Sequence, residues 1–439
     1  MDARELAWRI LLRGGNTPLR EVECASAREG LDERDRAFVR RLTGTALRRR
    51  GTLEAILRAF AARRPAPEIA LHVHLGLVQL LFLDRVPDHA AVSATCDAAA
   101  RGTGRGGVAF VNGVLRSVIR ARRAGHAGDR RRDLVDRDLH LERAVFRDPE
   151  RDLAGWVEDA LSVPASLFAR WVKRAGRERA LELARFFLHE PPLVLRARAD
   201  RGELVAELAH DGVAAEEGRL PDSIRTPSAQ AGEVLASRAF AEGRVTVQGE
   251  AAREAARLLQ ARQGERVLEL GAAPGGKTAQ LAETGARVFA CDVDPERMRS
   301  LRETTRRLGV AERVSAVVCD GVRAIGGAFF DAALVDAPCS NTGVLGARPE
   351  ARWRFGPESL RSLVALQTRL LEEAASKVRP GGRLVWSTCS LEPEENGERV
   401  WDFVVRSAEW KVEEECSFWP DAERGPWDGG YAARLRRRD

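Results

Sequence analysis

The stretch LELGAAPGGKT at residues 268–278 joins a short apolar run to a glycine-rich turn and the start of a helix. Gly271, Gly275 and Gly276 allow the backbone to approach a ligand closely, and the first N–H groups of a helix have no partner within it. The next apolar run ends in Asp292, about 20 residues after Gly271, the spacing at which a carboxylate binds ribose hydroxyls. We therefore expect a nucleoside-containing cofactor. A dinucleotide cofactor remains an alternative, because GAAPGG differs from the dinucleotide-binding pattern G-x-G-x-x-G by one alanine.

Short β-branched runs alternate with amphipathic helical patterns after this stretch. The expected strands cover residues 267–270, 287–293, 314–320, 332–337 and 383–389. Helices are expected over 296–308, ending before Gly309, and over 358–378, ending before Pro380-Gly381. This alternation is typical of a mainly parallel, doubly wound sheet. We predict an α/β Rossmann-like domain over residues 247–439.

Three further segments precede this domain, so the chain is expected to be multi-domain. Residues 1–125 have apolar residues at helical spacing and predict an all-α domain. Residues 126–153 carry many charges and few large apolar residues, which predicts an exposed connector. Residues 154–246 mix helical patterns with short apolar runs and predict a small α+β domain.

The positive charge is concentrated in the first domain. Residues 1–125 carry a net charge of +9, although the whole chain carries only +6. A basic surface favours a nucleic-acid partner because phosphate contacts release counterions, but a merely solvated arginine-rich surface fits this observation equally well. Only four basic residues are lysines, so Lys277 at the start of the helix after the glycine turn indicates a specific need for an ammonium group.

The histidines and cysteines exclude several classes of site. All seven histidines precede residue 211, which disfavours a Ser-His-Asp triad, a Cys-His hydrolase and a histidine-bound metal in the α/β domain. His72 and His74 lie in an apolar helical pattern and are expected to be core or edge residues. The seven cysteines form no CxxC pair, so we expect reduced thiols and no metal. The apolar run over 69–83 is shorter than the roughly 18 residues of a membrane span, and no apolar signal core follows the start, so a cytoplasmic protein is expected.

Two further strand ends carry reactive groups: Asp336-Ala337-Pro338-Cys339-Ser340 and Ser387-Thr388-Cys389-Ser390. A buried structural thiol is the commoner explanation for a single cysteine. The carboxyl ends of neighbouring parallel strands, however, face the same crevice. We therefore expect Asp336, Cys339 and Cys389 to converge near the cofactor.

These motifs resemble the RsmB (Sun/Fmu) family of bacterial 16S ribosomal RNA cytosine-5 methyltransferases, and the resemblance covers nearly the whole chain. A NusB-like N-terminal domain is matched by ERDRAFVRRLTGTALRRR at 33–50, LGLVQLLFLDRVPDHAAV at 75–92 and FVNGVLRSVIR at 110–120. Beyond the cofactor loop, the other matching stretches are VPASLFARW at 163–171, VQGEAAR at 247–253, DAPCSNTGVLGARPEARWR at 336–354, STCSLEPEENG at 387–397 and DGGYAARLRR at 428–437.

The resemblance implies roles for particular residues. Cys389 would be the nucleophile, Cys339 would help to release the product, and Asp336 would support addition to the cytosine ring. The cofactor would be S-adenosyl-L-methionine, bound by Gly271, Ala272, Ala273, Pro274, Gly275, Gly276, Lys277, Asp292, Asp320 and Asp336. The thiolates would need lowered pKa values, supplied by helix N-termini and the cationic sulfonium because no histidine is present.

The chain departs from the family pattern in two places. The usual Asp-x-Cys-Ala-Ala-Pro-Gly-Gly-Lys loop has Glu269 and Gly271 here, and the longer acid keeps the charge. The Leu-Arg-Val-Asn stretch of the middle domain is Leu195-Arg196-Ala197-Arg198 in this chain, which weakens the expectation of RNA contacts there.

The implied function is methylation of carbon-5 of a cytosine in 16S ribosomal RNA by a monomeric protein that binds neither DNA nor a membrane. Within the same chemistry, a transfer RNA or another ribosomal cytosine is a second substrate candidate. A catalytically silent RNA-binding assembly factor is an alternative of another class, which the intact Cys389, Cys339 and Asp336 disfavour. A nicotinamide-dependent oxidoreductase is a more distant alternative. An alanine replaces one glycine of the dinucleotide-binding pattern in the turn, and such an enzyme does not explain the second cysteine motif.

Overall fold

The computed structural model describes residues 2–15, 17–322, 326–421, 423, 425 and 427–439. Contacts between residues divide the chain into two compact units. The first, which we call the helical unit, consists of Met1–His189 and Arg348–Arg354. The second, the sheet unit, consists of Glu190–Ala347 and Phe355–Asp439. A short segment from the second half of the sequence therefore belongs to the helical unit.

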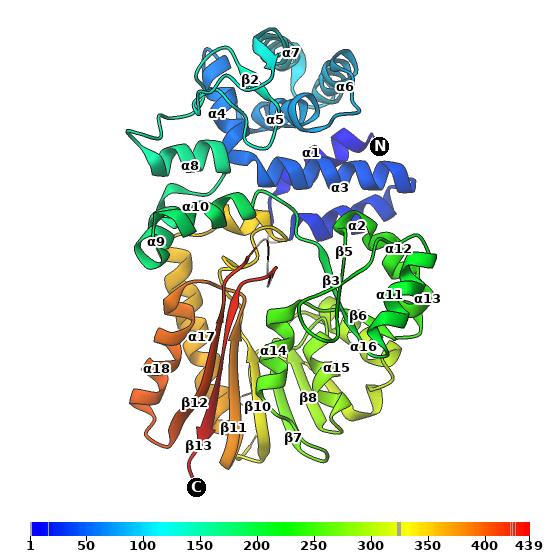
Figure 1. Cartoon of the computed structure of the whole chain (residues 1–439), viewed down its shortest axis with the longest axis vertical. Coiled ribbons are helices and arrows are strands. Elements are labelled where there is room, and N and C mark those ends of the chain that lie inside the picture. Colours follow the sequence, from blue (N-terminus) through cyan, green and yellow to red (C-terminus); the bar gives the residue numbers. More distant parts are fainter. Residues whose placement is uncertain (1, 16, 323–325, 422, 424, 426) are drawn as a thin grey trace. The chain divides into compact units, whose positions relative to one another are not determined.

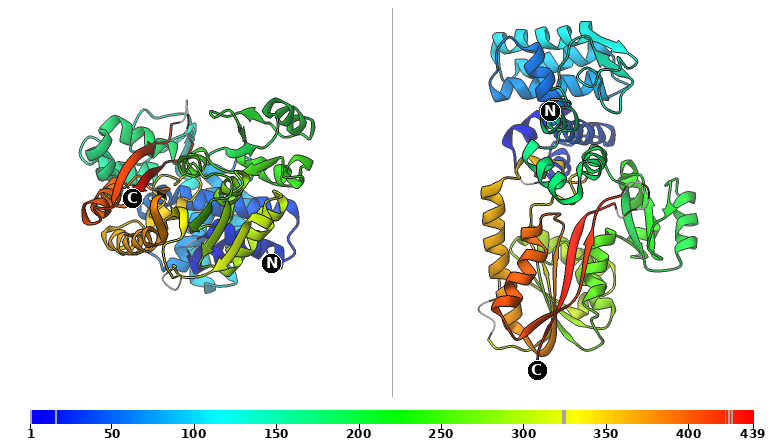
Figure 2. Two further views of the ribbon diagram at one scale, coloured as in Figure 1. Left: turned by 90° about the horizontal axis from the view of Figure 1, so that it is seen from below. Right: turned by 60° about the vertical axis from the view of Figure 1, so that its left-hand side comes forward.

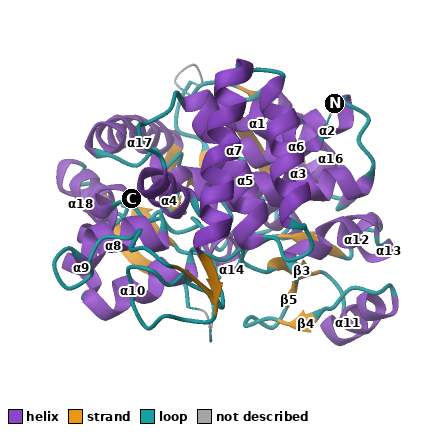
Figure 3. Cartoon of the chain, turned by 90° about the horizontal axis from the view of Figure 1, so that it is seen from above, coloured by secondary structure: helices purple, strands orange, loops and turns teal. Residues whose placement is uncertain are grey.

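The helical unit is a bundle with only short strands (Figure 3). Its central helix is α5 (Pro67–Phe82), in which every residue from His72 to Phe82 is buried. His72 stacks on Trp8 with ring centroids 4.8 Å apart, which is a core contact as expected. The other described elements are α1 (Ala3–Arg13), α2 (Pro18–Arg28), α3 (Glu33–Arg48), α4 (Arg50–Phe60), α6 (Asp88–Ala100), α7 (Gly104–Ala121), β1 (Arg122–Ala124), β2 (Leu139–Leu141), α8 (Leu153–Leu161), α9 (Ala165–Ala175), α10 (Arg177–Phe186) and η3 (Pro349–Trp353).

Arg352 of η3 is completely buried in the helical unit. Its guanidinium donates to the carbonyl oxygens of Arg48 at 3.4 Å, Ser162 at 3.0 Å and Phe187 at 2.8 Å. These carbonyls lie at the C-terminal ends of α3, α8 and α10, where helix carbonyls lack partners and the helix dipole is negative. One buried cation thus stabilises three helix ends.

The segment over 126–153 differs from the exposed connector that its charges predict. β1 and β2 form an antiparallel pair, and Leu134, Leu141 and Phe146 are buried. The charged residues pair locally, as in the 2.9 Å contact between Arg131 and Asp129. The few apolar side chains are therefore enough to pack the segment into the helical unit.

The residues expected to form a middle domain, 154–246, are divided between the two units. α8, α9 and α10 belong to the helical unit, whereas the following residues form a small antiparallel sheet in the sheet unit. This sheet has the order β4-β5-β3-β6, and the views in Figure 2 show its helices in green. Its elements are β3 (Leu193–Ala197), α11 (Arg201–His210), β4 (Glu216–Glu217), β5 (Ser223–Thr226), η1 (Ser228–Gln230), α12 (Ala231–Ala236), α13 (Arg238–Ala241) and β6 (Val245–Val247).

The rest of the sheet unit alternates strands and helices, as the sequence predicts. Its elements are α14 (Glu250–Leu258), β7 (Arg266–Leu270), α15 (Gly276–Glu283), β8 (Arg287–Asp292), α16 (Pro295–Arg307), η2 (Ala311–Arg313), β9 (Val314–Val318), β10 (Phe330–Asp336), α17 (Pro357–Lys377), β11 (Val378–Thr388), η4 (Pro393–Glu395), α18 (Gly397–Arg406), β12 (Trp410–Phe418) and β13 (Gly430–Arg437).

Over the described residues, the main sheet has the strand order β12-β13-β11-β10-β7-β8-β9. Strands β11, β10, β7, β8 and β9 are parallel, whereas β13 is antiparallel to both β11 and β12. Val267 and Leu334 pack into a core with α14, α15 and α16, while Leu268 and Val335 pack into a core with α17 and α18 on the opposite face (Figure 1). This alternation follows from the two-residue period of a strand. The expected doubly wound sheet is confirmed.

One boundary in this domain differs from the expectation. α17 ends near the predicted residue, but β11 begins immediately at Val378 and continues through Pro380-Gly381. Its pairing with β10 is irregular between Phe330 and Ala332, so the strand passes the proline and glycine without a regular ladder there.

Candidate active site

The order of the strands places the glycine turn at the switch point of the sheet, where successive strands stop being added on one side of β7 and continue on the other. β7 lies between β10 and β8, so the turn after β7 lies beside the carboxyl end of each neighbour. Ligands of doubly wound sheets bind at such a switch point. Gly271 has a φ of 73°, and a β-carbon there would lie 2.2 Å from the carbonyl oxygen of Asp336. A side chain at residue 271 would therefore push apart the ends of β7 and β10.

Asp292 connects the glycine turn to α16. Its buried carboxylate accepts the backbone N–H of Ala273 at 3.2 Å and that of Asp294 at 3.1 Å. Arg297 of α16 lies 3.1 Å from Oδ2 of the same carboxylate. The acid expected to bind a ribose is thus held at the end of β8 by the turn and the next helix.

Lys277 forms an ion pair with Asp336 at 2.8 Å. Burial alone would lower the pKa of Lys277, but the charge and hydrogen bond of Asp336 raise it. The lysine therefore stays an ammonium, and it fixes one oxygen of the carboxylate that precedes the Cys339 loop. The need for a lysine at this helix start has a structural explanation.

Glu269 lies below the turn on β7 and is fully buried. Neither carboxylate oxygen has a hydrogen-bond partner among the described residues. Burial raises the pKa of Glu269 to about 8, although the nearby Thr278 hydroxyl and the charge of Lys277 oppose this shift. An unpartnered acid beneath the switch point is what a site for a cationic ligand would contain.

The two cysteines predicted to converge lie in direct contact. The Sγ atoms of Cys339 and Cys389 are 3.2 Å apart, although the two residues follow different strands, β10 and β11. Asn341 touches both loops: its Nδ2 donates to the carbonyl oxygen of Cys339 at 2.7 Å, and the Cys389 thiol donates to its Oδ1 at 3.2 Å. Cys339 is buried, whereas Cys389 is partly exposed.

The pKa of Cys339 differs from the expectation that both thiols have lowered values. The hydrogen bond to Cys389 is the main cause that raises the pKa of Cys339 well above its usual value, followed by burial and the charge of Glu395. Cys339 is therefore a protonated thiol in this state. A protonated Cys339 is suited to holding and exchanging a proton rather than to attacking carbon.

Asp320, the acid expected near an adenine, is exposed after β9 and forms a 3.0 Å ion pair with Arg369 of α17. Among the expected acidic site residues, Asp320 is exposed, whereas Asp292 is buried. Arg196 and Arg198 also have defined partners: both bind the carboxylate of Glu283 at the end of α15, each with a contact of 2.7 Å. These arginines join the small sheet to the main one.

Sequence patterns did not indicate Asn341, Arg297 or Glu395 as site residues. Asn341 lies in the quoted DAPCSNTG stretch with a left-handed φ of 61°, and an Asn after Pro-Cys-Ser was the one available signal. Glu395 is fully buried between the two cysteine loops. A glutamate in an acidic stretch usually lies in solvent, so the sequence did not predict that Glu395 is buried.

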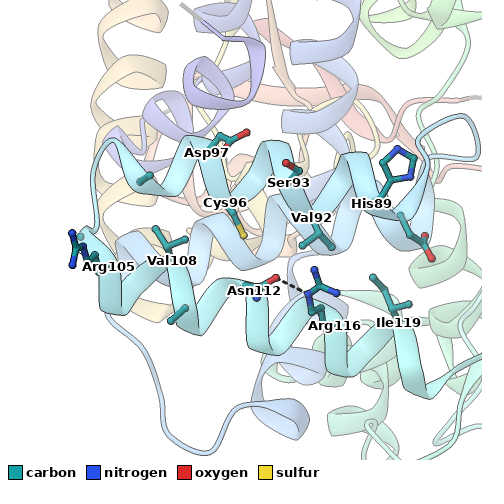
Figure 4. Close-up of a pocket in the computed structure, with 14 residues that line it drawn as sticks. His89, Val92, Ser93, Cys96, Asp97, Arg105, Val108, Asn112, Arg116 and Ile119 are labelled. Carbon is teal, nitrogen blue, oxygen red and sulfur yellow. Dashed lines mark hydrogen bonds between the residues drawn. The ribbon is translucent and has the colours of Figure 1, made fainter.

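A separate hollow lies in the helical unit between α6 and α7 (Figure 4). It has a volume of about 1140 Å³. The side chains of Cys96, Val92 and Val108 form its floor, and Arg105, Arg116 and His89 lie around its rim. Arg116 donates to the side-chain oxygen of Asn112 at 2.9 Å.

Neither a metal cluster nor a membrane span is found in the part of the chain that the structure describes. No group of three or more His, Cys, Asp or Glu side chains in these ranges is arranged to hold a metal ion. None of the described helices combines the length and the apolar character needed to cross a bilayer.

Comparison with known proteins identifies the family. Residues 256–423 match the family model described as 16S rRNA methyltransferase RsmB/F, and residues 1–120 match the NusB family. The probable ribosomal RNA small subunit methyltransferase B of Bacillus subtilis (strain 168) is 31% identical over 387 residues, which cover 85% of this chain and 81% of that protein. The chain belongs to the ribosomal RNA small subunit methyltransferase B family. It is therefore a methyltransferase with a NusB-like helical domain, as the resemblance implied.

Other members and solved structures agree with this assignment. The ribosomal RNA small subunit methyltransferase B of Xanthomonas campestris pv. campestris is 34% identical over 402 residues, covering 89% of this chain and 84% of that protein. The crystal structure of PH0851 covers 99% of this chain and 98% of its own, with a TM-score of 0.78 and 24% identity. That of NSun6 from Pyrococcus horikoshii with SFG covers 63% and 98%, with a TM-score of 0.56 and 21% identity. At these identities the two structures show the fold of the chain and nothing finer.

Proposed function

We propose that this chain transfers a methyl group from S-adenosyl-L-methionine to carbon-5 of a cytosine in 16S ribosomal RNA. The observation that carries this proposal is the 3.2 Å contact between Cys339 and Cys389, which lie at the same sheet edge as the glycine turn. The chemistry of cytosine requires a nucleophile that activates the ring and a second group that removes the carbon-5 proton so that the nucleophile can leave, and two adjacent thiols can fill these two roles.

The residues at the switch point fit S-adenosyl-L-methionine. The turn from Gly271 to Lys277 leaves backbone N–H groups at the start of α15, Asp292 ends β8, the next strand along the chain, and Asp320 follows β9. Asp336 provides negative charge for the cationic methionine end, and Glu269 is a buried acid on the strand before the turn. When bound, the cofactor supplies an electrophilic methyl group on a positively charged sulfur.

The cysteines and Asp336 divide the work on the base. Carbon-5 of cytosine is a weak nucleophile until the Cys389 thiolate forms a bond to carbon-6, which converts the ring to an enamine. Asp336 hydrogen-bonds the ring nitrogen and amine edge of the base and favours the protonated ring that accepts this addition. Once Cys389 is bonded to carbon-6 it no longer raises the pKa of Cys339. Cys339 can then release its own proton to solvent and, as a thiolate, take the proton from carbon-5 after carbon-5 has gained the methyl group. The electron pair reforms the double bond as the bond to Cys389 breaks.

The helical unit would bind the RNA. Its N-terminal 125 residues carry the excess positive charge of the chain, and the exposed Arg105 and Arg116 lie beside the hollow between α6 and α7. Guanidinium groups on a grooved surface are suited to bidentate contacts with phosphates. The target cytosine must leave its stack to reach the two thiols.

The direct test is incubation of the protein with labelled S-adenosyl-L-methionine and unmodified 16S ribosomal RNA, followed by mapping of 5-methylcytosine by bisulfite sequencing. We expect methylation at one cytosine, with no labelling in the Cys389→Ala protein. Unmodified transfer RNA and 23S ribosomal RNA, assayed in parallel, test the second substrate candidate. If no RNA were methylated although the cofactor bound, the proposal of a cytosine methyltransferase would be lost and an assembly factor favoured.

A further inference from the structure

Glu395 lies between the two cysteine loops, at the end of η4, and its side chain is fully buried. Its Oε1 accepts the backbone N–H of Ser340 at 2.8 Å and Nε2 of Gln367 at 2.9 Å. Its Oε2 accepts the hydroxyl of Ser390 at 2.5 Å and that of Ser340. Four donors from the described residues therefore occupy the four acceptor positions of one carboxylate.

The two serines bound by this carboxylate each follow a cysteine of the site. Ser340 comes directly after Cys339, and Ser390 comes directly after Cys389. The two serine hydroxyls are also 3.0 Å apart. Because adjacent residues in a chain move together, the carboxylate that binds both serines also restricts the separation of the two sulfur atoms, alongside Asn341, which contacts both loops.

A buried carboxylate is a costly choice for a merely structural contact. Burial of an ionised group is unfavourable unless hydrogen bonds replace its water, and the remaining donors lose their partner when the carboxylate is removed. Hydrogen bonds to a charged acceptor are shorter and about twice as strong as neutral ones. They give a more rigid link between the two loops than apolar packing would give.

We infer that Glu395 is a positioning residue that holds the Cys339 and Cys389 thiols at contact distance, without itself touching the RNA base. The inference rests on the proposed function for its catalytic meaning. The attack of Cys389 and the proton removal by Cys339 act on neighbouring ring carbons, so both steps depend on the separation that Glu395 restricts. The geometric part of the inference holds for the protein alone.

Phenylarsine oxide tests the geometry without RNA or cofactor. This trivalent arsenical bridges two adjacent thiols, forming two As–S bonds and releasing one water. In the unaltered protein we expect it to protect Cys339 and Cys389 together from iodoacetamide, as read by peptide mass spectrometry, which separates them from Cys291 and Cys319. In Glu395→Ala we expect joint protection to need at least about 10-fold more arsenical, the cost of losing roughly 1.4 kcal/mol of preorganisation.

Glu398→Ala is the matched control, because Glu398 is an exposed acid three residues away on α18. We expect it to behave like the unaltered protein. Ser340→Ala and Ser390→Ala each remove one hydroxyl, so they test the same link if Glu395→Ala fails to fold. If Glu395→Ala folds and its two cysteines are jointly protected at the same arsenical concentration as in the unaltered protein, the inference is overturned. If Glu395→Ala does not fold, the same result in the folded double variant Ser340→Ala/Ser390→Ala overturns it.

Kinetics separate positioning from binding. If 16S ribosomal RNA is methylated, we expect Glu395→Ala to lower kcat by about 100-fold while KM for RNA and the Kd of the cofactor change less than about threefold. Loss of thiol bridging in a protein that methylates no RNA would leave the geometric inference standing and remove the proposed function. If the unaltered protein methylates RNA but Glu395→Ala shows unchanged thiol bridging and unchanged kcat, the proposed function stands and the positioning role of Glu395 is overturned.

Discussion

The Nζ atom of Lys277 lies 2.8 Å from Oδ2 of Asp336, and this ion pair connects the helix after the glycine turn to the strand before Cys339. The lysine follows β7 and the aspartate ends β10, so the pair spans the switch point of the sheet. The carboxylate beside the turn is therefore held in place by the protein itself.

We predict that Lys277→Ala weakens binding of S-adenosyl-L-methionine by about 10- to 100-fold, since a hydrogen bond to a charged group contributes roughly 1.5–3 kcal/mol. Isothermal titration calorimetry with the cofactor measures the change directly. Lys411→Ala removes an exposed lysine on β12 and is expected to leave the Kd unchanged. Equal affinities for the Lys277 variant and the unaltered protein would show that the ion pair with Asp336 does not contribute to cofactor binding.

The two cysteines should give opposite results when they are replaced. Cys389→Ala should lower methylation more than about 1,000-fold and form no adduct, because no sulfur remains to bond carbon-6. Cys339→Ala should accumulate a protein–RNA adduct that resists denaturation, because the carbon-5 proton is no longer removed. Denaturing gel electrophoresis with labelled RNA distinguishes the two. Adduct in the Cys389 variant would reverse the assignment of roles.

Glu269 predicts a pH dependence of stability in the protein without cofactor. Burial raises its pKa to about 8 in the folded state, above the value of about 4.3 in an unfolded chain. The folded protein therefore holds the extra proton, and the stabilisation present below about pH 4.3 is lost as the pH rises toward 8. Lys277, Asp336 and Asp292 face the same carboxylate, so the loss depends on all four charges.

Glu269→Gln should remove this dependence. We expect its melting temperature to exceed that of the unaltered protein by several degrees at pH 8.5, with a smaller difference at pH 5.5. Thermal unfolding at the two pH values measures the effect. A parallel fall in both proteins would mean that Glu269 does not carry the titration.

The α6–α7 hollow predicts a salt-dependent effect on RNA binding. If Arg105 and Arg116 contact phosphates, replacing both with alanine should reduce the slope of log affinity against log salt by about 1.4 to 1.8, and kcat should stay within about twofold. Filter binding at several salt concentrations measures the slope. Arg63→Ala changes an exposed arginine in the loop after α4 and should leave it unaltered.

Much of the site could be predicted because it lies at strand ends. The positions of Gly271, Asp292, Asp336, Cys339 and Cys389 follow from strand periodicity and from the rule that parallel strands end at one edge. That rule predicts that the two cysteines converge, whereas the 3.2 Å contact between their sulfur atoms depends on side-chain packing and was not predicted.

Features that depend on long-range contacts were not predictable. The burial of Glu395 requires two loops to meet around it, and no local pattern distinguishes it from the exposed Glu398. The packing of Leu134 and Phe146 in a charged segment depends on surrounding helices. The raised pKa of Cys339 arises from a neighbour fifty residues away in sequence, not from its own strand.

The position of Arg352 constrains how a protein of this kind can be rearranged. The polypeptide leaves the sheet unit after Ala347 and re-enters it at Phe355, a few residues after the Cys339 loop. A gene fragment that ends at residue 189 would encode three helix termini without their shared cation. Recombination at a single crossover would therefore separate the front domain from a part of its own interior. Exchange of that domain between enzymes would require the seven-residue segment to be transplanted with it.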